Sequence, residues 1–168
     1  GMAVRFQGRY ERASGRLQDY MRSPSEESLN RVKDCLPDVI YHPGFMWEYC
    51  RHLYLNRRYC DCLGVFPVYH AHVRKTSETL CDLGNAYLNV YGFREAEACF
   101  AQARQMIPTR IYPRYCLFRL YRSQGDTLRA RQTAEALVAF PVRIMNSTSI
   151  RIKAEARNYL KHLRRNDW

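Results

Sequence analysis

Two short motifs in the chain contain residue types that bind zinc. Cysteines stand at Cys60 and Cys62, and histidines at His70 and His72. Two thiolates with two imidazoles form a common tetrahedral zinc set. We expect both motifs to lie in a helix, where residues two positions apart point about 200° away from each other. Neither pair can then chelate a metal from one face, so the sequence predicts no metal and no cofactor.

The chain lacks the residue patterns of an enzyme active site. None of its five histidines lies near a serine or cysteine flanked by glycines, and no glycine-rich loop could cradle a phosphate. Glu95 and Glu97 are expected on an exposed helix surface, where they serve solubility rather than catalysis. The sequence therefore predicts a protein that is not an enzyme.

The composition is that of an ordinary globular protein with excess positive charge. The longest apolar runs, such as Leu63 to Val68, fall far short of the roughly 20 residues that cross a bilayer. The N-terminus has no apolar segment of a signal peptide. The net charge is +11, and most of the 27 basic residues are arginines. This balance favours an acidic peptide, a lipid surface or nucleic acid as partner, with a merely solvated arginine-rich surface as the alternative.

The seven cysteines argue against a full disulfide framework, because their number is odd. Most of them lie inside apolar helical patterns, where cysteine behaves as a small buried residue. We expect a reducing, cytoplasmic environment. A location at a membrane, as part of a longer protein, is the alternative.

The chain contains an internal repeat with a period of about 34 residues, which is typical of stacked helical hairpins. Leu83, Tyr87 and Ala96 recur one period later as Leu117, Tyr121 and Ala130, and Phe100 is preceded one period earlier by Phe66. We expect three hairpins over residues 43–76, 77–110 and 111–142.

Particular residues should shape each hairpin. Gly84 and Ala96 are expected to let two helices approach closely beside Phe100. Gly92 should permit the tight turn in the middle copy. In the first copy, Gly64 and Pro67 should bend or shorten the second helix.

Further helices are expected on both sides of the repeats. Residues 2–42 read as an N-terminal helical pair, with a degenerate repeat as the alternative. Its second helix should begin at Ser23, with Glu26 completing a capping box, and stop before Pro37. Residues 143–168 read as a capping helix that begins at Ser147–Ser149 and covers the last apolar face.

These residues resemble the tetratricopeptide repeat. The match is carried by Leu83, Gly84, Tyr87, Phe93, Ala96, Phe100, Ala103 and Pro108. The resemblance implies an all-α fold, a right-handed α-α superhelix of three hairpins with extra N-terminal helices and a C-terminal capping helix. More narrowly, Trp47 to Leu160 resembles the C-terminal soluble region of bacterial O-antigen-ligase-like membrane proteins. The stretches "MIPTRIYPRY" and Pro141 to Ile152 carry that likeness. The membrane portion of such proteins is not in this chain, so no glycan transfer is assigned to it.

The tetratricopeptide resemblance also implies a concave groove that binds an extended peptide. The positions it assigns to the groove are Trp47, Arg51, Tyr54, Asn85, Leu88, Asn89, Tyr112, Tyr115, Arg119 and Arg122. Asparagines there can bond a peptide backbone and arginines can pair with its carboxylates. Cys81 and Cys116 replace polar clamp residues, so we do not expect binding of a chaperone C-terminus. Ordinary repeat surface is the alternative.

Three functions fit the sequence. The first is a non-enzymatic scaffold for protein–protein interaction that binds an acidic peptide or partner, and the narrower resemblance implies a surface-polysaccharide assembly system as its setting. The second is nucleic-acid binding by a basic helical repeat, although no pair of base-reading side chains recurs from copy to copy. The third is a regulatory or anchoring module for a membrane glycan polymerase.

Overall fold

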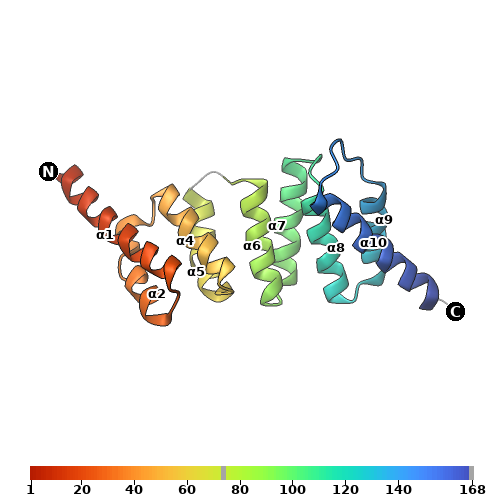
Figure 1. Ribbon diagram of the computed structural model, residues 1–168, viewed down its shortest axis with the longest axis horizontal. Coiled ribbons are helices and arrows are strands. Elements are labelled where there is room, and N and C mark those ends of the chain that lie inside the picture. Colours follow the sequence, from red (N-terminus) through yellow and green to blue (C-terminus); the bar gives the residue numbers. More distant parts are fainter. Residues whose placement is uncertain (73–74, 167–168) are drawn as a thin grey trace. The chain divides into compact units, whose positions relative to one another are not determined.

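The computed structural model describes residues 1–72 and 75–166, and throughout them the chain is helical or in connecting turns (Figure 1). The all-α prediction is therefore confirmed, with ten helices and no strand in the described ranges. The helices are α1 (Met2–Arg22), α2 (Glu26–Lys33), α3 (Leu36–Val39), α4 (Pro43–Leu55), α5 (Tyr59–His72), α6 (Ser77–Asn89), α7 (Phe93–Met106), α8 (Tyr112–Gln124), α9 (Thr127–Ala139) and α10 (Ser147–Asn166). None of these helices is both long and apolar enough to cross a bilayer.

The chain divides into two compact units, residues 1–74 (unit 1) and 75–168 (unit 2). In unit 1, α1 packs against α2, α3 and α4, and α4 packs against α5. An ion-pair cluster also ties α2 to α5, because Arg58 pairs with both Glu26 and Asp61 while Lys33 Nζ lies 2.7 Å from an Asp61 oxygen. Burial of the Asp61 carboxyl opposes its charge, but the hydrogen bonds from Lys33 and Arg58 prevail and lower its pKa.

Unit 2 is built by each helix packing on the next one along the chain, from α6 to α10. Two apolar clusters lie in this unit. The first is centred on Leu80, Ala96, Phe100, Leu117 and Ala130. The second comprises Phe118, Ala134, Leu137, Ile152 and Ala156, so α10 buries its apolar stripe against α8 and α9. Neighbouring helices thus hide one another's apolar faces, as stacked repeats require.

A left-handed residue closes the turn of all three helical pairs, at the same position of each repeat. These residues are Arg57 (φ 60°), Tyr91 (φ 63°) and Gly125 (φ 72°). In each turn the following amide donates to the carbonyl five residues back: Arg58 to Leu53 at 2.8 Å, Gly92 to Tyr87 at 2.8 Å, and Asp126 to Tyr121 at 2.9 Å. This is the Schellman motif that ends many helices. The expectation that Gly92 supplies the turn's conformational freedom is wrong: Gly92 has φ −81° and is the N-cap of α7, and Tyr91 takes the left-handed position.

The close approach expected at Gly84 is confirmed. A Cβ atom placed on Gly84 would lie 2.4 Å from Cε1 of Phe100, and Phe100 is completely buried between α6 and α7. Only glycine leaves room for this ring, because carbon atoms in contact are normally about 3.5–4.0 Å apart.

Several helix ends differ from the sequence prediction. The cap of α2 is Ser25, whose hydroxyl accepts from Ser28 N and forms the capping box with Ser28 rather than with Glu26. Ser23 is instead the C-cap of α1. The expectation that α2 stops before Pro37 is confirmed, because α2 ends at Lys33, and Pro37 lies in the first turn of the short helix α3.

Two other helices also bear on the sequence predictions. Helix α10 begins at Ser147, as expected, but its cap is Asn146, whose side chain accepts from Ser149 N at 2.8 Å. Helix α5 runs through Gly64 and Pro67 for 14 residues, the same length as α7, so of the two expected effects shortening does not occur.

Candidate binding surfaces

The residues that sequence analysis placed in a groove belong to both units. Unit 1 contains three of them, all on α4: Trp47 and Tyr54 are half-buried and Arg51 is exposed. The Tyr54 ring contacts Tyr59 at a centroid distance of 5.8 Å. The other seven lie in unit 2, on α6 and α8.

On α6, the predicted groove residues differ in their accessibility. Asn85 is only 1% exposed and Leu88 is also buried, whereas Asn89 is exposed. The side-chain amide of Asn85 donates to the hydroxyl of Tyr112 at 3.3 Å, and Asn89 donates to the carbonyl of Asn85 at 2.8 Å. Asn85 therefore joins α6 to α8, and of the three only Asn89 is open to a partner.

On α8, the four predicted residues form a row of aromatic and basic side chains. We call Tyr112, Tyr115, Arg119 and Arg122 the α8 face. The rings of Tyr112 and Tyr115 are 6.1 Å apart, and the guanidinium of Arg119 lies 5.7 Å from the Tyr115 ring centroid. Spacings of three and four residues bring these side chains to one side of the helix.

The C-terminal helix supplies an acidic residue to this row. Glu155 of α10 accepts a hydrogen bond from the Tyr115 hydroxyl at 2.8 Å and pairs with Arg122 at 2.7 Å. Burial and then the bond to Glu155 raise the pKa of Tyr115. Arg119 makes no ion pair within residues 1–72 and 75–166. The row thus contains one neutralised arginine and one whose charge remains unpaired.

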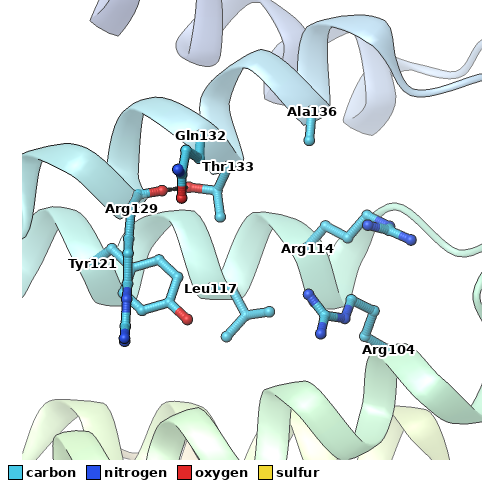
Figure 2. Close-up of a pocket in the computed structure, with 8 residues that line it drawn as sticks. All are labelled: Arg104, Arg114, Leu117, Tyr121, Arg129, Gln132, Thr133 and Ala136. Atoms are coloured by element: carbon cyan, nitrogen blue, oxygen red, sulfur yellow. Dashed lines mark hydrogen bonds between the residues drawn. The ribbon is translucent and has the colours of Figure 1, made fainter.

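A pocket of about 320 Å³ lies on the other side of α8. Leu117 and Tyr121 of α8 lie about 200° around the helix from Tyr115 and Arg119 respectively. The pocket is bounded by α7, α8 and α9 and lined by Arg104, Arg114, Leu117, Tyr121, Arg129, Gln132, Thr133 and Ala136 (Figure 2). We call it the arginine pocket. None of its lining residues is acidic.

Two ends of the arginine pocket differ in charge balance. At one end, Arg129 pairs with Glu97 at 3.4 Å and stacks on Tyr121, whose hydroxyl also donates to Glu97 at 2.9 Å. Glu97 therefore bridges neighbouring helices, a contact that the expected solubilising role did not include. At the other end, Arg104 of α7 and Arg114 of α8 both line the pocket (Figure 2).

Sequence analysis missed the arginine pocket. Arg104 stands in the last turn of α7 and Arg114 in the first turn of α8, so a short connection brings them together. That proximity of consecutive helix ends was the available signal.

Of the residues first considered for zinc, Cys60 and Cys62 differ in their surroundings on α5. Cys60 is exposed and Cys62 is buried, with its sulfur 3.8 Å from the carbonyl oxygen of Cys50. His70 is buried beside the ring of Phe66, and the side chain of His72 lies outside the described residues. Across the described ranges, no group of three or more potential ligands could hold a metal ion.

No model of a known protein family matches the chain, and no curated protein matches it.

Proposed function

We propose that the chain is a tetratricopeptide-like scaffold without catalytic activity, and that unit 2 binds an extended acidic segment of a partner protein on the α8 face. Support for the repeat comes from the three equivalent left-handed turns and from the packing of each helix on the next. Hairpins that stack with a small constant rotation form a superhelix, and the right-handed form is the one that the resemblance implies.

One observation carries the choice of partner. Arg119 is held over the Tyr115 ring and is only half-buried, yet no carboxylate of the described residues neutralises it. An arginine that is oriented by an aromatic ring loses little freedom when it binds, and it can accept a carboxylate with two parallel hydrogen bonds. Glu155 already pairs with the neighbouring Arg122, which shows that a carboxylate fits in this row.

The partner's main chain has polar neighbours on the same surface. The exposed side chain of Asn89 lies on α6, one turn beyond Asn85, which contacts Tyr112. We propose that the segment crosses α8 with an acidic residue at Arg119 and an aromatic or apolar residue against Tyr112. The assembly system in which such a partner works would be one for surface polysaccharides, on the resemblance noted above.

Selection from a random peptide library tests this proposal. Peptides that bind the full chain should be enriched in Asp and Glu, and Arg119→Glu should weaken them about 10- to 100-fold, since a hydrogen bond to a charged group contributes about 1.5–3 kcal/mol. Arg157→Glu is the matched control, because Arg157 is exposed on α10 and its substitution changes the net charge equally. Equal loss in both variants, or no acidic enrichment, would contradict the proposal.

A basic helical repeat that binds nucleic acid is the second candidate, favoured by the net charge of +11. Such binding would fall steeply with salt. In a gel-shift assay, the chain should then retard a DNA or RNA duplex, and this retardation should fade as salt is raised. Equal weakening by Arg119→Glu and Arg157→Glu would favour nucleic-acid binding over peptide binding.

A further inference from the structure

We infer that the arginine pocket is a binding site for the phosphate group of a small organic phosphate. The site is separate from the α8 face, because it lies on the other side of α8, and the inference does not depend on the proposed partner. It begins from the unusual charge balance at one end of the pocket.

Arg104 and Arg114 contribute two guanidinium groups without a counter-ion. Neither forms an ion pair within the part of the chain that the structure describes, although Arg129 at the opposite end has both Glu97 and Asp126 within 4.0 Å. Two like charges on adjacent helices that line one pocket repel each other. An anion placed between them would replace that repulsion with attraction.

Arg114 also has a hydrogen-bond donor that lacks an acceptor. Its guanidinium lies 5.2 Å from the ring centroid of Phe140, and its Nε is buried with no hydrogen-bond partner. Leaving a buried donor unsatisfied costs about 1–3 kcal/mol, more when the group is charged. A ligand oxygen could accept from this Nε–H only after the Arg114 side chain turns toward the pocket, and the unsatisfied donor favours that movement.

The number and arrangement of donors favour phosphate over carboxylate. A carboxylate has two oxygens in one plane, which a single arginine can satisfy, whereas a phosphate monoester presents three acceptor oxygens in a tetrahedral arrangement and carries up to two negative charges. Two arginines, one from α7 and one from α8, supply enough donors for the three oxygens of a phosphate.

The remaining space indicates that the phosphate belongs to a larger molecule. About 320 Å³ lies at the lower end of the range for small-molecule sites. Leu117 and Ala136 give the pocket apolar walls, and Gln132 and Thr133 line it on the side of α9 (Figure 2). Because the Thr133 hydroxyl donates to the Arg129 carbonyl at 2.8 Å, its oxygen is left to accept a hydrogen bond from a ligand hydroxyl.

Calorimetric titration of the full chain with three probes tests the inference. Glycerol 3-phosphate should bind more tightly than inorganic phosphate, and glycerol should not bind. Arg104→Gln and Arg114→Gln should each weaken glycerol 3-phosphate at least 10-fold. Arg94→Gln is the control, since Arg94 is an exposed residue of α7 and its replacement removes the same charge.

A second variant separates a built site from general attraction by a basic protein. Ala136→Trp keeps all three arginines and fills the pocket from an exposed position on α9, so it should abolish binding while circular dichroism shows an unchanged fold. The inference is overturned if no phosphate probe binds, if Arg94→Gln weakens binding as much as Arg104→Gln, or if Ala136→Trp still binds. Should Arg114→Gln fail to fold, Arg104→Gln and Ala136→Trp decide the result.

Discussion

Replacing Gly84 with alanine perturbs the tightest helix contact in unit 2. The new methyl group would lie 2.4, 2.7 and 2.9 Å from three carbon atoms of the Phe100 ring. To restore ordinary contact of about 3.5 Å, ring and helix must separate by about 1 Å. Phe100 is fully buried, so this displacement has to be shared by its neighbours.

Two effects of opposite sign determine the size of the change. Overpacking a filled core costs about 1–3 kcal/mol, whereas alanine is favoured over glycine inside a helix by about 1 kcal/mol. Because three ring atoms are affected and the ring is enclosed, we expect a steric cost in the upper part of that range, about 2–3 kcal/mol. After the helix gain of about 1 kcal/mol is subtracted, Gly84→Ala should lower the free energy of unfolding of unit 2 by about 1–2 kcal/mol.

Urea denaturation followed by circular dichroism measures this change, and hydrogen exchange read by mass spectrometry assigns it to α6–α7. Gly64→Ala is the control: it places the same methyl group inside helix α5, where no atom lies within 4 Å, so it should stabilise by about 0.5–1 kcal/mol. Phe100→Leu should recover part of the loss in the Gly84→Ala background. A Gly84→Ala protein as stable as the original would refute the packing argument.

Two further predictions concern turns and pH. Gly125→Ala should lower the free energy of unfolding by about 1 kcal/mol, because a side chain at φ 72° is strained although nothing lies within 4 Å of the added methyl group. Gly125→Asn should lower it by less. Equal urea midpoints for the two variants would count against backbone strain as the cause. The lowered pKa of Asp61 stabilises unit 1 above the pKa of an unfolded aspartate, about 3.9, and that stability is lost as pH falls through the lower folded value. The urea midpoint should therefore drop between about pH 5 and pH 2.5 by more in the original chain than in Asp61→Asn, and an equal drop would show that Lys33 and Arg58 do not favour the charged carboxylate.

The elements that depend on local pattern could be predicted from sequence. The repeat period predicted paired helices, and Gly84 beside Phe100 predicted their close approach. Sequence could not decide whether Ser23 or Ser25 is the N-cap of α2. The answer depends on where α1 ends, and Ser23 is the C-cap of α1. The left-handed backbone of Tyr91 was missed because glycine is the residue that normally adopts this conformation, and Gly92 is its neighbour in the sequence.

Contacts between distant residues were beyond the reach of sequence pattern. Glu155 is 40 residues from Tyr115, and only packing of α10 on α8 and α9 brings them together. The arginine pocket was missed for another reason: Arg104 and Arg114 stand on either side of the α7–α8 connection, and this spacing was overlooked among the many arginines of the sequence. Asn85 was placed by its position in a repeat, but its neighbours Tyr112 and Cys116 bury it.

The equivalent turns at Arg57, Tyr91 and Gly125 separate what the three hairpins share from what distinguishes them. Each hairpin closes with the same main-chain hydrogen bonds, so the backbone course is independent of the side chain at the turn. Recognition can then differ from one copy to another: the position of Arg119 is held by Asn85 in the copy before it and by Arg51 two copies before. On the proposed function, the three hairpins would share one backbone turn, while the side chains that contact a partner would differ from copy to copy.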